Sequence, residues 1–197
     1  MARSYHHGDL RNALLEAALT LIAEGRVGEL SLREVARRAG VTYAAPYHHF
    51  ADKSALLAAV ATQGFEKLVE KFDRVAARRL APEAELVAMA QAYVAFAQAH
   101  PSHYRVMFSP DVKDSPDAAA LSVAGDRAFG VLLERVAQVR PAEPAATHST
   151  LAATVWASLH GLSLLAIDGV LKKKFQRPEK IVQDACRSIV GMIRVDR

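Results

Sequence analysis

Residues 31–50 read SLREVARRAGVTYAAPYHHF, and this stretch predicts two helices joined by a tight turn. Ser31 and Glu34 form a capping box, in which the hydroxyl caps the helix and the carboxylate reaches back to its first amide. Gly40 is expected to end that helix, because glycine adopts the positive φ that such a turn often needs. A second short helix is expected from Thr42, which suits an N-cap. Two helices joined by a short turn containing glycine are typical of a helix-turn-helix, whose second helix fits the major groove of DNA.

The expected second helix lacks the apolar stripe that its neighbours carry. Its exposed face has hydroxyl, imidazole and small side chains, which donate to phosphates or rest against base edges. Any short helix after a glycine turn has a similar face, so this pattern alone leaves DNA reading open. The residues of the face are Thr42, Tyr43, Ala44, Tyr47 and His48.

Helical periodicity continues on both sides of this stretch, and no strand-like alternation of useful length interrupts it. The sequence therefore predicts an all-α fold of about nine helices, with a small N-terminal unit (residues 1–53) leading into a larger helical bundle (residues 54–197). Besides the two helices above, helices are expected from Leu10 to Ile22, from Asp52 to about Arg79, from Pro82, over 101–109, over 117–139, from about 147 to 173, and from Pro178, with loops at 110–116 and 140–144.

Composition fits a folded cytoplasmic protein. The chain has 197 residues, of which 51% are apolar and 23% charged, and these values exclude a mainly disordered chain. Its net charge of +4 permits nucleic acid as a partner without requiring it. The single cysteine, Cys186, excludes a disulfide scaffold and fits a reducing compartment. The N-terminus does not read as a signal peptide, and the longest apolar stretch, 157–171, is too short for a membrane span.

Residues 8–55 resemble the N-terminal domain of the TetR family of transcriptional repressors. The resemblance rests on the first helix ending at Gly25, the run SLREVARRAGVT over 31–42, and the signature YHHFADK over 47–53. The second half carries WASLHG over 156–161, which resembles the family's C-terminal variant marked by a Trp-His-Gly pattern. Together these matches extend over nearly the whole chain.

The resemblance implies a homodimer whose paired recognition helices bind a palindromic double-stranded DNA operator. Tyr43, Ala44 and Ala45 then lie at the base-facing start of the recognition helix. Phosphate contacts or helix positioning fall to Thr42, Tyr47, His48, His49 and Lys53, and Ser31 and Arg33 approach the DNA backbone from the preceding helix.

Pro46 departs from the family pattern, which usually has Leu or Ile at this position. Proline has no amide to bond back to Thr42, and it disfavours helical geometry at Ala45. We therefore expect a loose or 3₁₀ first turn. The N-terminal arm from Arg3 to His7 either tracks a phosphate or the minor groove, or is a disordered tail, which is the commoner case.

The last two expected helices are apolar over much of their surface. This suits pairing with the same helices of a second subunit, although the same residues also suit the core of one subunit. The resemblance favours dimerisation, and it implies an unidentified small-molecule effector that releases the DNA. A mainly apolar effector is expected if a pocket is lined by Phe65, Met89, Tyr93, Phe96, Tyr104, Met107, Phe108, Phe129, Trp156 and His160, each of which is alternatively a core residue.

No motif in the sequence predicts a metal, a cofactor or a catalytic centre. His48 and His49 point in different directions on a helix, and no cluster with metal-ligand spacing accompanies them. Glycine-rich phosphate loops and nucleophile elbows are absent, so the sequence predicts no enzyme. Two alternatives stay open: an architectural DNA-binding protein without a ligand, and a small helical enzyme that uses the C-terminal pocket.

Overall fold

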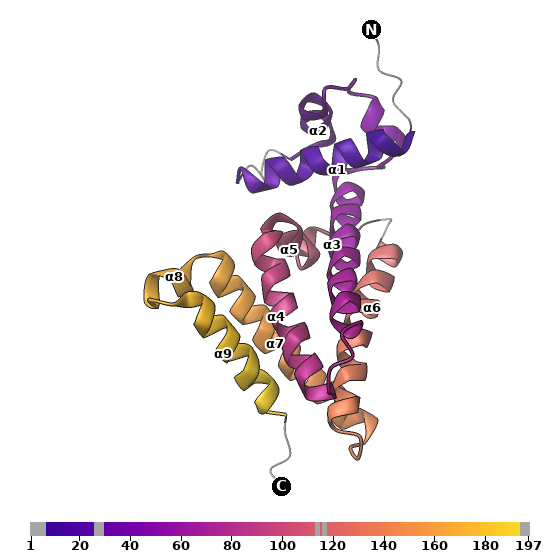
Figure 1. Cartoon of the computed structure of the whole chain (residues 1–197). Helices are drawn as coiled ribbons and strands as arrows, with labels where there is room; N and C mark the ends of the chain where they lie inside the picture. The colour runs from indigo at the N-terminus through magenta and orange to yellow at the C-terminus, as the bar shows by residue number, and fades with distance from the viewer. Residues whose placement is uncertain (1–6, 26–29, 113–114, 116–117, 194–197) are drawn as a thin grey trace. The chain divides into compact units, whose positions relative to one another are not determined.

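The computed structural model describes residues 7–25, 30–112, 115 and 118–193, and most of these lie in helices (Figure 1). Within them lie nine α-helices and two 3₁₀-helices, which confirms the all-α prediction. The elements are α1 (His7–Ala23), α2 (Leu32–Ala39), η2 (Ala45–His48), α3 (Lys53–Ala76), α4 (Pro82–Ala99), α5 (Pro101–Met107), η3 (Pro110–Val112), α6 (Ala118–Val139), α7 (Ala145–Ile167), α8 (Val170–Lys174) and α9 (Pro178–Gly191).

Packing divides the described residues into two compact units. Unit 1 comprises those up to Gly64 together with Pro101–Ala124, and unit 2 comprises Phe65–His100 together with those from Gly125 onward. Helices α3 and α6 therefore contribute residues to both units. The predicted boundary after residue 53 concerns a division of function and stays a prediction.

In unit 1, the periodic apolar residues of α1 form one buried face. Leu14, Ala18 and Leu21 are fully buried, and α2 packs against this helix. An ion pair between Arg38 and Glu24 links α2 to the chain just after α1. Helix α5 also packs on α1. These contacts hold α2 in a fixed place within the unit.

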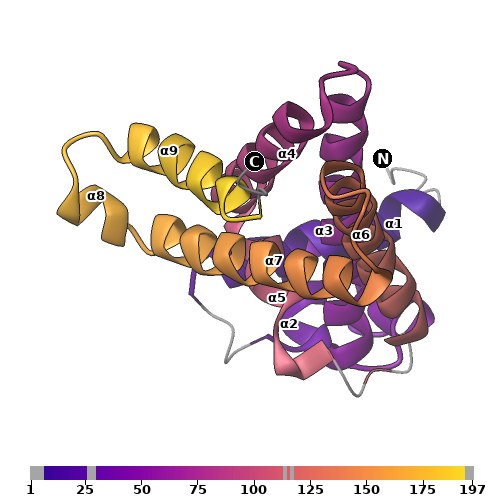
Figure 2. The same ribbon diagram turned by 90° about the horizontal axis from the view of Figure 1, so that it is seen from below.

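In unit 2, α4 packs against both α7 and α9, and the three helices lie side by side in two views (Figures 1 and 2). Glu85 of α4 and Arg135 of α6 form a largely buried ion pair, with Oε1 and Nε 3.0 Å apart. The remaining core is apolar apart from the buried Ser163 of α7. Its fully buried members include Leu86, Val94, Phe96, Val136, Ala152, Val155, Cys186 and Val190.

Two sequence predictions about element boundaries are wrong. The helix expected over 147–173 is two helices, α7 and α8, because Gly169 adopts a left-handed conformation (φ 71°) between them. The loop expected over 110–116 contains the short 3₁₀-helix η3. Most other predicted helices are present with ends shifted by a few residues, and α4, α5 and α9 begin at the expected prolines.

Candidate nucleic-acid interface and small-molecule sites

The start of α2 shows the Ser31 bond of the predicted capping box, and its end shows the predicted glycine of positive φ. The Ser31 hydroxyl oxygen accepts a hydrogen bond from the Glu34 amide at 3.2 Å, which confirms the N-cap. At the other end Gly40 has φ 69° and ψ 31°. The Gly40 amide donates to Arg37 and the Val41 amide donates to Ala36 at 3.0 Å, which is the Schellman pattern. The chain therefore leaves α2 in a fixed direction.

The helix expected from Thr42 is present but begins later, and it is a 3₁₀-helix throughout. Residues 43 and 44 form a turn, the 3₁₀-helix η2 begins at Ala45, and its N-cap position is Ala44, with no side-chain cap. The physical reason is Pro46, because an α-helix beginning at Thr42 needs an amide at residue 46 to donate to the Thr42 carbonyl. The Ala45 amide donates to that carbonyl instead, at 3.0 Å. The looser first turn expected from Pro46 is thus a 3₁₀ turn.

Two buried residues anchor η2 in unit 1. Pro46 is buried, and Phe50 is only 2% exposed, so both side chains lie inside unit 1. The Arg11 guanidinium of α1 lies 5.4 Å from the centre of the Phe50 ring, within the range of a cation–π contact. These contacts fix one side of η2 and leave the opposite side at the surface.

The predicted DNA-contacting residues gather around α2, η2 and the start of α3. Tyr43 is 61% exposed and Tyr47 is 55% exposed, values that are unusual for tyrosine and suit a contact surface. The more buried members would position the others. Ser31, Arg33, Thr42, Tyr43, Ala44, Tyr47 and His48 are exposed, whereas Ala45, His49 and Lys53 are half-buried.

A hollow of about 450 Å³ lies beside this surface, lined by Ser31, Arg33, Glu34, Arg37 and Tyr43. The Glu34 carboxylate accepts two hydrogen bonds from the Arg37 guanidinium, at 2.6 and 2.8 Å, and this pairing raises the pKa of Arg37. Sequence reasoning missed Glu34 and Arg37 as lining residues. Their spacing of three on α2 was the available sign, because residues three apart share a helix face.

The predicted ligand residues fall into different units. Tyr104, Met107 and Phe108 belong to unit 1, whereas the other seven belong to unit 2. Several of them are core residues in the structure, which agrees with the alternative interpretation that they fill the core rather than line a pocket. Met89, Tyr93, Phe96, Tyr104 and Met107 are buried, Phe65, Phe108, Phe129 and His160 are half-buried, and Trp156 is 39% exposed.

An aromatic cluster in unit 2 brings three of these residues together. The Trp156 indole N–H donates to the Tyr93 hydroxyl at 3.3 Å. The Phe129 and Trp156 rings meet edge to face, with centres 5.9 Å apart. His160 follows one turn later on α7, and burial lowers the pKa of its imidazole. The cluster is therefore an apolar patch whose neutral imidazole is suited to hydrogen bonding.

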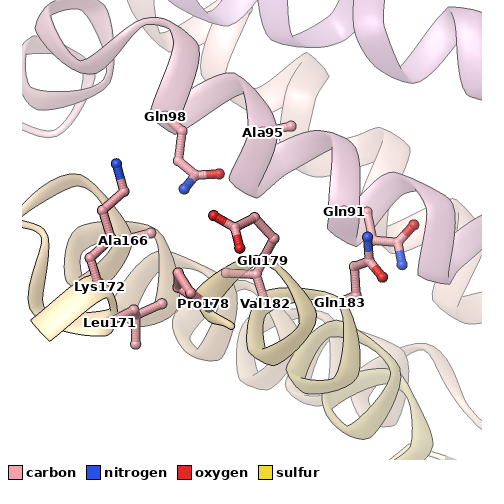
Figure 3. Close-up of a pocket in the computed structure, with 10 residues that line it drawn as sticks. All are labelled: Gln91, Ala95, Gln98, Ala166, Leu171, Lys172, Pro178, Glu179, Val182 and Gln183. Carbon is pink, nitrogen blue, oxygen red and sulfur yellow. The ribbon is translucent and has the colours of Figure 1, made fainter. Parts of the chain in front are cut away.

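A second pocket, of about 230 Å³ and with a mixed polar and apolar lining, lies in unit 2 between α4, α9 and the end of α7 with α8, and sequence reasoning missed it (Figure 3). None of the ten predicted ligand residues lines it. One sign in the sequence was the polar or small side chains at positions 91, 95 and 98, which share a face of α4. The lining residues are Gln91, Ala95, Gln98, Ala166, Leu171, Lys172, Pro178, Glu179, Val182 and Gln183.

Metal and thiol chemistry have little support in the structure. Over the described ranges, no group of three or more His, Cys, Asp or Glu side chains is placed to hold a metal ion. Cys186 is fully buried on α9, and burial raises the pKa of its thiol to about 11. A thiol of that pKa is almost entirely protonated near neutral pH, so it behaves as a small apolar side chain.

Two family models match the sequence. The model described as "Bacterial regulatory proteins, tetR family" matches residues 14–60, which include the α2–η2 surface. The model described as "Tetracyclin repressor-like, C-terminal domain" matches residues 86–189, more than half of the chain. No curated protein matches the sequence.

Solved structures are similar over almost the whole chain. A protein of unknown function from Rhodococcus sp. RHA1 is 33% identical, with a TM-score of 0.79 over 97% of this chain and 98% of that one. A transcriptional regulator from the same Rhodococcus is 26% identical, with a TM-score of 0.73 over 93% and 95%. A TetR-family transcriptional regulator from Thermus thermophilus is 18% identical, with a TM-score of 0.67 over 93% and 99%, and shows the shared fold alone.

Proposed function

Because this chain belongs to the TetR family and is a DNA-binding transcriptional regulator, not an enzyme, we propose that it is a repressor that binds a palindromic operator as a homodimer. The observation that carries this proposal is the surface of α2 and η2. Two exposed tyrosines stand there on a segment whose other side is anchored by Pro46 and Phe50. Recognition of a DNA base sequence requires polar side chains that are exposed and held in place.

Roles at this surface follow from side-chain chemistry. Tyr43, Ala44 and Ala45 face base edges, where the methyl groups contact thymine and the hydroxyl donates or accepts. Arg33 contacts a phosphate, because it is exposed and makes no ion pair within the described residues. Ser31, Thr42, Tyr47, His48, His49 and Lys53 contact phosphates or hold the segment in place. With two alanines on the reading face, DNA shape contributes to specificity.

Dimerisation through α7 and α9 is part of the proposal. The prediction that no apolar stretch is long enough for a membrane span does not hold for α7, which is apolar enough by length and composition to cross a membrane, with a mean hydropathy of 1.5. Only 28% of that window is buried within one subunit. The same helices of a second subunit would cover this face in a four-helix bundle. Such a bundle fixes the spacing of the paired reading segments, and we place the dimer in the cytoplasm.

The effector in this proposal is a mainly apolar small molecule. Its site is the cluster of Tyr93, Phe129 and Trp156, with His160 donating or accepting a hydrogen bond, and the C-terminal domain is of the Trp-His-Gly type. Effector binding shifts the protein to a state in which the reading segments are wrongly spaced for the operator. Helix α3 is continuous through both units and is the proposed route of this coupling.

The test is selection of binding sites from a random duplex pool at near-physiological salt. We expect enrichment of one palindrome. Arg33→Ala should weaken binding several-fold on all sequences and reduce the salt dependence by about one released counterion. Arg78→Ala, an equal charge change at an exposed arginine of unit 2, should leave binding unchanged.

Other outcomes separate the alternatives. Folded, dimeric protein that binds all sequences alike, with a steep salt dependence, would indicate an architectural DNA-binding protein. Absence of DNA binding by that protein would contradict the proposed operator recognition.

A further inference from the structure

We propose that the pocket between α4, α8 and α9 binds a small zwitterion of the neutral α-amino-acid class. Its volume of about 230 Å³ has space for several water molecules and hence for a ligand of that size. All of its walls belong to unit 2. The site is separate from the aromatic cluster proposed for the effector.

The charges around the pocket favour a ligand that carries both signs. Lys172 of α8 supplies an ammonium group and Glu179 of α9 supplies a carboxylate. Within the described residues, neither side chain makes a hydrogen bond or an ion pair. A carboxylate ligand alone would meet Glu179, and an amine alone would meet Lys172, so each would face a like charge. A zwitterion places its carboxylate by Lys172 and its ammonium by Glu179.

Three amide side chains complete the polar part of the pocket. Gln98 points toward Glu179, and Gln91 lies next to Gln183, in Figure 3. These amides also make no side-chain hydrogen bond within the described part of the chain. An amide supplies both donors and acceptors, so the three add to recognition of either end of a zwitterion. The pocket is open to solvent, since Gln98, Lys172, Glu179 and Gln183 are exposed, and polar groups that converge on a surface pocket are a feature of ligand sites.

The floor of the pocket narrows the class of ligand. The apolar part of its lining comprises Leu171 and Ala166, which are buried, and Val182 of α9. These apolar side chains suit a short aliphatic substituent. An amino acid with a short aliphatic side chain therefore matches both the charges and the floor, whereas a third charge on the ligand would have no partner there.

Calorimetric titration of the purified full-length protein with L-leucine and L-valine tests the proposal. We expect binding of at least one of them. The matched analogues 4-methylpentanoate, which lacks the amine of leucine, and 3-methylbutylamine, which lacks its carboxylate, should bind at least about tenfold more weakly, because each loses a charged hydrogen bond. Failure of both amino acids to bind, or equal binding of either analogue, would overturn it.

Variants locate the binding. Lys172→Met and Glu179→Gln should each weaken binding of the amino acid at least about tenfold. The matched controls are Lys173→Met, at the next residue, and Glu66→Gln, at an exposed site on α3, and both should bind as the unchanged protein does. Equal losses in the controls would overturn the assignment. The proposal does not rest on the proposed repressor function, since the titration contains no DNA.

Discussion

At the scale of the residue, Asp52 shows how one carboxylate sets the start of a helix. Its Oδ1 accepts hydrogen bonds from the Ser54 hydroxyl at 2.7 Å and the Ala55 amide at 2.8 Å. These bonds, the Ser54 hydroxyl first, lower the pKa of Asp52 below its ordinary value. The ionised form therefore stabilises the fold, fully above the unfolded-state pKa, and this contribution is lost as the pH falls through the folded-state pKa.

Removal of this cap should destabilise the protein. We expect Asp52→Ala to lower the free energy of unfolding by about 1 kcal/mol at pH 7. The difference from the unchanged protein should shrink as the pH falls below about 4, the ordinary pKa of an unfolded aspartate, and should vanish once the folded-state carboxylate is protonated as well. Urea unfolding followed by circular dichroism at a series of pH values measures both effects.

Asparagine provides the matched control, because its side-chain oxygen accepts the same bonds but does not titrate. Asp52→Asn should keep most of the stability at pH 7 and lose the pH-dependent part. A constant difference between Asp52→Ala and the unchanged protein across the pH range would contradict this account.

The Ser31 cap could be predicted from the sequence because both partners of its bond lie within three residues, and the helix start at Asp52 depends on bonds that are equally local. The pairing of Glu34 with Arg37 is equally local, yet it was missed as part of a lining. The pair lines a hollow only because Tyr43 lies beside it, and the turn at Gly40 is what brings Tyr43 to that place. Local hydrogen bonds were therefore predictable, whereas the grouping of side chains across a turn was not.

At the scale of the element, the turn after α2 depends on a backbone conformation that glycine adopts without strain. Gly40 has φ 69°, and a β-carbon added there meets nothing within 4 Å, so any cost of a side chain comes from the backbone alone. Gly40→Ala should therefore lower the free energy of unfolding by about 1–2 kcal/mol. Thermal or urea unfolding measures the change.

Gly130 is the matched control, because it lies within α6 and a β-carbon there also meets nothing within 4 Å. Its φ is not in the left-handed range. Gly130→Ala should raise the free energy of unfolding by about 0.5–1 kcal/mol, since alanine favours a helix interior. A change of the same sign in both variants would contradict the argument from backbone conformation.

Two of the misjudged elements have different causes. Between α2 and α3, the sequence indicated that Pro46 opposes an α-helix but did not indicate which backbone conformation replaces it. The structure has a turn followed by η2. At Gly169 the apolar run continues on both sides, so periodicity concealed the break between α7 and α8. Periodicity reports which face is buried, and it is insensitive to a single left-handed residue.

At the scale of the whole molecule, the sequence could predict helices but not which of them would meet. The pocket of Gln98, Lys172 and Glu179 needs α4, α8 and α9 together, and α4 lies far from the other two in the sequence. The expected aromatic site shows the same limit. Tyr104 and Trp156 share a chemical character but belong to different compact units.

The exposed apolar face of α7 predicts where two subunits meet in the dimer. Ala153, Ala157 and Gly161 are exposed at four-residue spacing, and such small residues allow close approach of a second helix. If this face is the proposed dimer interface, Ala157→Arg places an unpaired charge at its centre. Burial of such a charge costs several kcal/mol, so the variant should be monomeric and should bind a selected palindromic operator at least about a hundredfold more weakly.

Light scattering coupled to size-exclusion chromatography, in buffer without detergent, measures the assembly, and titration against the operator measures the affinity. Ala84→Arg, at an exposed alanine of α4, is the matched control and should remain dimeric with unchanged affinity. Both variants should keep the helical content of the unchanged protein, because both sites are exposed within one subunit. If Ala157→Arg is dimeric, the dimer interface lies elsewhere than on this face of α7. If the unchanged protein is monomeric and still binds the operator, operator binding requires no dimer.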